Sequence, residues 1–341
     1  MVNETGDLKI IIRNGPLSVE WEDSPGSSRV RAFLSEHNGS VELRLRAADS
    51  PPQDLRVPVT IRIPPGMEVD RIESVSQSSS LDLRLAGAVI RTLEVTTGTG
   101  SNYIELSGCT VEAAHIESAY GRSYLVAEYT TISSDLSMKG NPVEEHIAYY
   151  DRTAGAVHLG LSNCSIGGML CMESVAGKIE LYADDTTLNG GVGVSSNRAM
   201  QYLDLWDCSL PSGAPVTASS DRGRIELRWA QHEENGEDMT FDISTGGEDI
   251  YFRVWGPFDI NRYDITALTG AGLLEFHSLE DFNALEGGTR YRSKNYDEPL
   301  DLMTVHLRTD SREIYARVVD CYKPLRFCGD FKVMKPMDPP F

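Results

Sequence analysis

LRLAGAVI at residues 83–90 returns as IELSGCTV at 104–111, LVAEYTTI at 125–132, LGLSNCSI at 159–166 and LDLWDCSL at 203–210, with a looser copy, IELYADDTTL, at 179–188. The apolar residue that closes each copy recurs after 21, 21, 34, 22 and 22 residues. A fixed period of this size is typical of stacked supersecondary units. The sequence therefore predicts an all-β fold, a β-solenoid (β-helix) with a single stack of coils of about 21–22 residues.

Each copy opens with an apolar, a variable and again an apolar residue, which indicates a strand with one buried face. A second short strand follows and ends in Ser, Thr and Gly, residues that favour turns. Coils stacked about 4.8 Å apart share their inward side chains. The predicted buried column contains Ile104, Leu125, Leu159, Leu181, Leu203 and Ile225.

The chain divides into three regions within one continuous structural domain. Residues 1–70 alternate apolar and polar residues around Asn14-Gly15 and Asn38-Gly39, which predicts an antiparallel β cap at the N-terminal end. Residues 71–283 contain the predicted coils, and the long spacing of 34 marks a loop inserted at 140–152. Residues 284–341 lose the period and are interpreted as an irregular, β-containing C-terminal cap.

The stretch VPVTIRIPPGMEVDRIESVSQSSSLDLRL, residues 57–85, carries a resemblance to a known family. Together with the Ser/Thr-Gly turns it resembles the "putative adhesin" β-solenoid domains of bacteria and archaea, whose molecular function is unknown. The resemblance covers roughly residues 8–230 and implies a fold and a surface-associated role, without catalytic residues. Its positions are Val59, Ile61, Ile63, Pro64, Gly66 and Ser78 to Ser80.

The composition restricts the partners of the chain. Lys and Arg number 31 against 51 Asp and Glu, so the net charge is −20. Such a surface repels phosphates and anionic lipids, which excludes nucleic acid as the expected partner. The sequence has no apolar run of about 18 residues, so no membrane insertion is expected, and its start lacks the features of a secretory signal. A protein or a glycan partner, and any oligomeric state, stay open.

Stacked carboxylates are the sharpest candidate for chemistry. Glu180, Asp204 and Glu226 are expected to project outward from successive coils about 4.8 Å apart. Such a stack could share a proton or a divalent cation, or act as the paired acids of a glycosidase. Trp206, Trp229 and Arg228 are expected on the same face. A plain solvated acidic stripe is the alternative.

No other residue type forms a convincing site. Cys109, Cys164 and Cys208 recur at one position of the pattern but not on neighbouring coils, so they are expected to fill a corner as free thiols. Cys321 and Cys328 could form a disulfide across a hairpin. The chain lacks a catalytic motif, a zinc-binding spacing and a phosphate-binding loop, and we assign no catalytic, cofactor-binding or metal-binding residue. His146, beside Glu144 and Glu145 in the inserted loop, is the histidine with neighbours suited to a site, and a plain surface histidine is the favoured interpretation.

The sequence as a whole favours a non-enzymatic, adhesin-like interaction or structural module. The alternative is a carbohydrate-active β-helix enzyme, a polysaccharide lyase or glycoside hydrolase. A groove that combines acids, arginines and aromatic residues along one sheet would favour the enzyme.

Overall fold

A computed structural model of the chain describes strands at 7–13, 18–21, 30–37, 40–47, 59–62 and 68–76, and then residues 80–319 apart from 141–153, 232–235, 271 and 278. The all-β class is confirmed. Helical structure among these residues is limited to three 3₁₀ turns, Pro211–Gly213, Leu279–Asp281 and Glu286–Gly288. The predicted loop beyond Gly140, the turns at Asn14 and Asn38, His146, and Cys321 with Cys328 lie outside the described residues.

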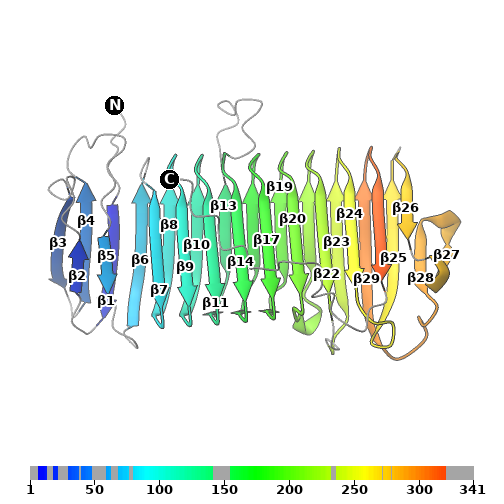
Figure 1. Cartoon of the computed structure of the whole chain (residues 1–341), viewed down its shortest axis with the longest axis horizontal. Helices are drawn as coiled ribbons and strands as arrows, with labels where there is room; N and C mark the ends of the chain where they lie inside the picture. Colours follow the sequence, from blue (N-terminus) through cyan, green and yellow to red (C-terminus); the bar gives the residue numbers. More distant parts are fainter. Residues whose placement is uncertain are drawn as a thin grey trace.

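Two large sheets contain nearly all strands (Figure 1). The ten-stranded sheet has the spatial order β26, β30, β24, β22, β20, β17, β14, β11, β9, β7, and its strands are parallel. In chain order these strands are β7 (Leu81–Ala86), β9 (Asn102–Ser107), β11 (Ser123–Glu128), β14 (Val157–Ser162), β17 (Ile179–Asp184), β20 (Gln201–Trp206), β22 (Ile225–Ala230), β24 (Ile250–Trp255), β26 (Leu274–His277) and β30 (Ile314–Val319).

The 18-stranded sheet is parallel in its long central part and antiparallel at both ends. Its central strands are β6 (Glu68–Ser76), β8 (Val89–Thr97), β10 (Thr110–Ser118), β12 (Thr131–Ile132), β13 (Leu136–Gly140), β15 (Ser165–Ile166), β16 (Leu170–Ser174), β18 (Thr187–Leu188), β19 (Val192–Ser196), β21 (Val216–Ser220), β23 (Met239–Thr245), β25 (Asn261–Thr269) and β29 (Asp301–Thr309).

Antiparallel strands flank this central part. At the N-terminal end, β1 (Asp7–Arg13) pairs with β4 (Ser40–Ala47) and with β6, and β3 (Val30–His37) pairs with β4. A small separate sheet joins β2 (Ser18–Trp21) to β5 (Val59–Arg62). At the C-terminal end, β27 (Phe282–Leu285) and β28 (Arg290–Ser293) form an antiparallel pair next to β25.

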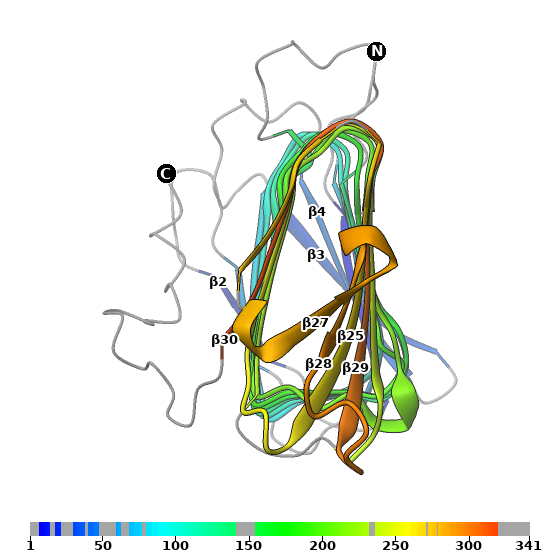
Figure 2. The same ribbon diagram turned by 90° about the vertical axis from the view of Figure 1, so that its right-hand side faces the viewer.

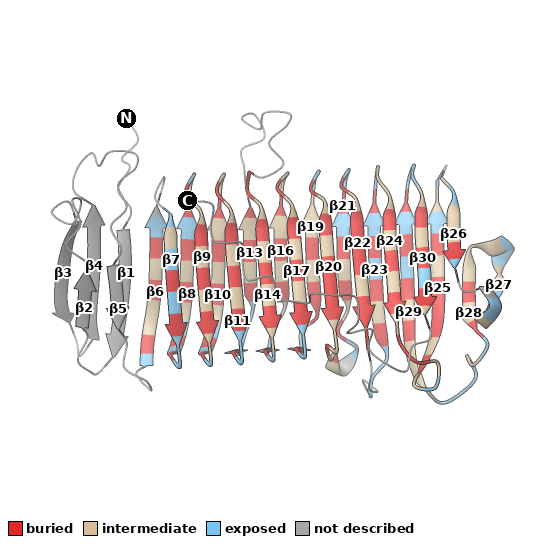
Figure 3. Ribbon diagram, viewed as in Figure 1, coloured by how far each residue is buried: buried red, intermediate tan, exposed pale blue. Residues whose placement is uncertain are grey.

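From β6 to β26 the chain passes back and forth between the two large sheets, so the sheets face each other as two walls (Figure 2). Along each strand the buried side chains alternate with more exposed ones (Figure 3), as a half-buried strand requires. The inward side chains of both sheets form one continuous apolar cluster.

The predicted buried column is confirmed for five of its six residues. Ile104, Leu125, Leu159, Leu181 and Leu203 lie in register on neighbouring strands and are fully buried. The sixth, Ile225, was assigned to the wrong column. Although Ile225 is also buried, it pairs with Gln201, and Leu227 takes the place beside Leu203. A shift of two residues leaves a side chain on the inward face, so the apolar pattern alone does not detect it.

The order of the last strands differs from their order in the chain. Sequence spacing predicts that the strand at 273–279 follows the one at 250 directly. Instead, β30 pairs with β24 on one side and with β26 on the other. In the other sheet, β29 lies between β23 and β25 in the same way. The chain therefore skips one position, turns back through β27 and β28, and fills the gap with residues 301–319.

A corner with a left-handed backbone follows each strand in the first part of the ten-stranded sheet. Residues with φ between 47° and 61° occupy one equivalent position: Gly87, Gly108, Tyr129, Asn163, Asp185 and Asp207. The residue that follows each of the last five corners is buried: Cys109, Thr130, Cys164, Thr186 and Cys208. The three cysteines are free thiols. The Cys164 thiol lies 3.3 Å from the carbonyl oxygen of Ala127. The corner-filling role predicted for the cysteines is confirmed.

Candidate functional site

The outward side of the ten-stranded sheet carries two in-register columns of large polar side chains. The first column consists of Asp82, Tyr103, Tyr124, His158, Glu180, Tyr202, Glu226, Tyr251 and Tyr315. The second consists of Arg84, Glu105, Val126, Gly160, Tyr182, Asp204, Arg228, Arg253 and Arg317. We call these two columns, together with Trp206 and Trp255 at the ends of their strands, the tyrosine face.

The predicted stack of three carboxylates is wrong. Glu180 and Glu226 belong to the first column, but Tyr202 stands between them. Asp204 belongs to the second column, between Tyr182 and Arg228. The three carboxylates therefore do not neighbour one another along either column, and each has its own partners. The shared proton or cation that three adjacent acids would favour has no basis in this arrangement.

Glu180 is held by two donors. Its carboxylate accepts a hydrogen bond from Lys178 and lies 3.3 Å from Nδ1 of His158. Burial alone would raise the pKa of Glu180, but the contacts with His158 and Lys178 outweigh burial and lower the pKa to about 2. Glu180 is therefore ionised over the whole physiological range.

Replacing Glu180 by Gln is expected to destabilise the fold in a pH-dependent way. A carboxyl group whose pKa falls from 4.5 to about 2 on folding adds stability above pH 4.5 and loses it as the pH falls toward 2. At about 1.4 kcal/mol per pKa unit this change corresponds to about 3.5 kcal/mol, and solvent screening of the partly exposed carboxylate reduces the expected loss to about 2–3 kcal/mol near neutral pH. Urea denaturation of both proteins across this range measures it, and a difference that persists unchanged at pH 2 would contradict the assignment.

Asp204 is the most buried acid of the tyrosine face, with 2% of its surface exposed. Nε1 of Trp206 donates a hydrogen bond to Oδ1 at 2.7 Å, and the hydroxyl of Tyr202 donates to Oδ2 at 3.1 Å. Burial raises the pKa of Asp204 above its usual range, although these bonds and Arg228 oppose the shift. Both carboxylate oxygens are occupied by fixed donors, so Asp204 is poorly placed to transfer a proton to a substrate.

Glu226 lies between two arginines. Nη2 of Arg228 is 2.7 Å from Oε1, and Nη2 of Arg224 is 3.2 Å from Oε2. The same guanidinium groups lie over aromatic rings, Arg228 at 5.0 Å from the ring centroid of Tyr202 and Arg224 at 4.0 Å from that of Tyr251. Planar guanidinium groups can combine a carboxylate contact with stacking on a ring in this way.

Four aromatic rings form a continuous row along the tyrosine face, which passes from the first column to Tyr182 in the second column and back. Centroid distances are 5.4 Å for each of the pairs Tyr124–His158, His158–Tyr182 and Tyr182–Tyr202. Farther along, the rings of Tyr251 and Tyr315 stack at 4.6 Å. These rings are partly exposed, so they present rigid amphipathic surface to solvent.

The two tryptophans expected on this face have different positions. Trp206 is outward, and its ring stacks with Trp255 at 6.1 Å across the small side chain of Ala230. Trp229, in contrast, is fully buried and packs edge-on against Phe241 in the core. It occupies an inward position beside Leu205, so its expected place on the tyrosine face is wrong.

The tyrosines are functional candidates that the sequence prediction did not include. Tyr103, Tyr124, Tyr202, Tyr251 and Tyr315 each stand one residue before the second inward residue of their strand. The signal was therefore present in the sequence as tyrosine at a fixed position of the repeating pattern. Alignment on the apolar residues alone leaves this position as an unspecified variable residue.

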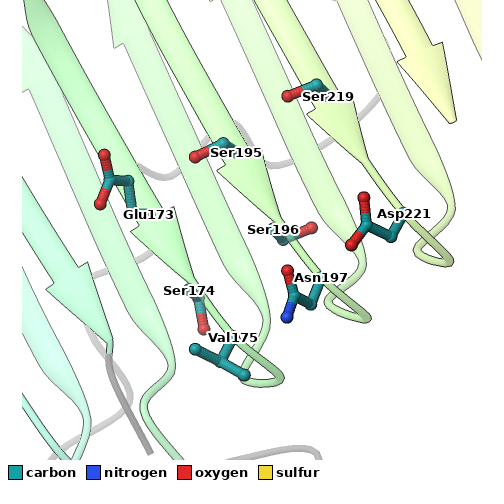
Figure 4. A pocket seen from close by; sticks show the side chains of 8 residues that line it. All are labelled: Glu173, Ser174, Val175, Ser195, Ser196, Asn197, Ser219 and Asp221. Atoms are coloured by element: carbon teal, nitrogen blue, oxygen red, sulfur yellow. The ribbon is translucent and has the colours of Figure 1, made fainter.

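The outward side of the 18-stranded sheet is chemically different. From β8 to β23 its outward strand positions carry no tyrosine, tryptophan or phenylalanine among the described residues. Figure 4 shows a hollow of about 280 Å³ on this side, where strands β16, β19 and β21 end. Serines and two acids line it, and Glu173 is paired with Lys139 at 2.9 Å. This lining offers hydroxyl groups but no ring to stack on.

One further group of acids lies at a corner. Carboxylate oxygens of Asp184, Asp185 and Asp207 lie within 4.8 Å of one another. The spacing of these oxygens is short enough for a metal ion, and the sequence prediction did not include these acids. Asp184 and Asp185 are exposed, and exposed acids often gather on solvated surfaces without binding a metal ion.

Comparison with known proteins identifies no family. No family model matches the chain, and no curated protein matches it. Among solved structures, the chain is similar to a protein from Clostridium sporogenes described as a "putative cell adhesion protein". The identity is 13%, the TM-score is 0.26, and the match covers 47% of this chain and 56% of that one. No described helix is long and apolar enough to cross a membrane.

Proposed function

We propose that the chain is an adhesin-like β-solenoid that acts as a non-enzymatic interaction module and holds its ligand on the tyrosine face. The observation that carries this proposal is the chemical difference between the two outward faces. Tyrosine, tryptophan and arginine are the residue types that contribute most to binding energy at recognition surfaces. Here they gather on the ten-stranded sheet, while serine and threonine dominate the middle of the opposite sheet.

The strand pairing supports the solenoid part of the proposal. From β7 to β24, each strand of the ten-stranded sheet pairs in parallel and in register with its counterpart one repeat later. The intervening strands do the same in the other sheet. An elongated stack of this kind presents one long surface, which suits a protein that attaches to an extended ligand.

The state of the acids supports the non-enzymatic part. A glycosidase needs one carboxylic acid and one carboxylate that can reach the scissile bond. On the tyrosine face Glu180 and Glu226 are paired with cations, and Asp204 is bonded to two neighbouring side chains. We therefore expect ligand retention without cleavage.

Attachment to cells tests the proposal. Fluorescently labelled protein is incubated with cells of the encoding organism, and binding is measured by flow cytometry. The double variant Tyr182→Ala/Tyr202→Ala is expected to bind at least fivefold less. The matched control Ser195→Ala/Ser219→Ala, on the outward side of the opposite sheet, is expected to bind as the parent does. Equal binding by all three proteins would overturn the proposal, and release of reducing ends or unsaturated sugars from added polysaccharides would show an enzyme.

A further inference from the structure

We infer that the ligand of the tyrosine face is a neutral, linear polysaccharide. This inference rests on the proposed function, because it names the chemical class that the same face would hold. It follows from three properties of the face: its amphipathic rings, the paired charges on its central strands β17 and β22, and its extended layout.

The rings match the surface of a sugar. A pyranose presents C–H groups on its two flat sides and hydroxyl groups around its edge. Partly exposed tyrosine rings offer flat apolar area, and neighbouring carboxylates and guanidinium groups offer hydrogen bonds. Tyr202 shows the combination at one point: its ring contacts the ring of Tyr182, Arg228 lies over it, and its hydroxyl is bonded to Asp204. Such fixed rings lose little conformational entropy on binding.

The paired charges on the central strands indicate that the ligand is neutral, while Arg253 and Arg317 continue the second column beyond Arg228 without a neighbouring acid in that column. Glu226 is compensated by Arg224 and Arg228, and Glu180 by Lys178. A charged ligand would have to displace these pairs, at the cost of leaving buried charges unpaired. In addition, the net charge of −20 repels polyanions such as polyuronates at long range.

The layout indicates a linear chain. Ring contacts continue from Tyr124 to Tyr202, and a second group follows at Tyr251 and Tyr315 on strands farther along the same sheet. An extended polymer can contact several such rings at once, so weak contacts add up along its length. A single small sugar would use only one of them.

The exposed apolar residues argue against a protein partner on this face. Protein interfaces have an apolar core surrounded by a polar rim. Among residues with described exposure, the large apolar side chains exposed to solvent are Val75, Val89, Tyr129, Leu268 and Leu273. None of these belongs to the tyrosine face. The face lacks the contiguous apolar centre that a second copy of the chain or another protein would bury.

An array of linear oligosaccharides tests the inference directly. The probes are neutral hexasaccharides of glucose, mannose, xylose, galactose and N-acetylglucosamine in α and β linkages, with hexagalacturonate as the anionic comparison. We expect binding to at least one neutral probe and none to the anionic one. Calorimetry with that probe is expected to show at least tenfold weaker binding for Tyr202→Ala, and little change for Tyr202→Phe, which keeps the ring.

Matched variants separate a local effect from misfolding. Tyr129→Gly removes an exposed tyrosine at a corner outside the face, and binding is expected to stay the same. Tyr251→Ala removes a ring at the other end of the face and gives a second independent test if Tyr202→Ala fails to fold. Thermal unfolding of each variant shows whether the fold is retained.

The remaining outcomes distinguish this inference from the proposed function. If no neutral probe binds while Tyr182→Ala/Tyr202→Ala still abolishes attachment to cells, the glycan assignment is wrong and the interaction module stands. Binding that is unaffected by Tyr202→Ala and Tyr251→Ala, or that favours hexagalacturonate, overturns the inference. A dimer in sedimentation velocity that the double variant disrupts would assign the face to a second copy instead.

Discussion

Replacing Leu203 by Asp is expected to abolish cooperative folding of the chain. Leu203 is fully buried, and its neighbours in the column are Leu181 on β17 and Leu227 on β22. Removing a buried leucine side chain costs about 2–5 kcal/mol, and an unpaired buried carboxylate adds several kcal/mol more. The sum is comparable to the whole stability of a typical domain, about 5–15 kcal/mol. Circular dichroism during urea denaturation should show no cooperative transition.

Two companion variants make this expectation specific. Leu203→Ala removes the same packing without a charge and should remain folded, with a loss of about 2–5 kcal/mol. Ser219→Asp adds the same charge at an exposed position of β21 and should change stability by less than about 0.5 kcal/mol. If Leu203→Asp unfolds cooperatively with a stability close to that of Ser219→Asp, Leu203 does not belong to the core.

The inward positions could be predicted from sequence because alternation of apolar and polar residues reports directly on which side of a strand is buried. Ile104 and Leu125 were placed correctly on this basis. Alternation does not report the register along the stack, because a two-residue shift preserves it. Ile225 and the acids Glu180 and Asp204 were misplaced for this one reason. Counting back four residues from the left-handed corner residues Asp185 and Asp207 gives the observed pairing of Leu181 with Leu203, and so places Tyr202 beside Glu180.

The tyrosine face depends on the same register. Only when the corners are aligned do Tyr202 and Glu226 fall in one column, and Asp204 and Arg228 in the next. The alternation of acids with tyrosines and arginines then follows. The hydrogen bonds that Asp204 accepts from Trp206 and Tyr202 depend on side-chain conformation. The spacing of residues in the sequence could not predict them.

The place of β29 and β30 could not be predicted from sequence, because strand pairing between distant segments depends on which edges remain open after the chain has turned back. The residues 301–309 carry the same apolar alternation as any interior strand, with Met303, Val305 and Leu307 inward and buried. The loss of the regular spacing after residue 283 was interpreted as a cap. In the structure it instead accompanies the excursion through β27 and β28.

Replacing Val305 by Asp is therefore expected to destabilise the protein about as strongly as Leu203→Asp. Val305 is fully buried and lies in register between Phe241 on β23 and Ile265 on β25. A charge at this position separates the strands on both sides, so the final strands, β25 and β26 included, should lose their packing. If Val305 instead belonged to a loosely packed terminal cap, the same substitution would lower the free energy of unfolding only slightly.

His306→Asp is the matched control, since it places the same charge one residue farther along β29 on the outward side. Its neighbour Asp242 adds a like-charge contact that costs about 0.2–1 kcal/mol. Urea denaturation followed by tryptophan fluorescence compares the two variants, because Trp229 packs against Phe241 directly beneath the altered strand pair. A Val305→Asp protein within about 1 kcal/mol of His306→Asp would mean that residues 301–319 do not lie inside the stack, and the reversed strand order would have to be abandoned.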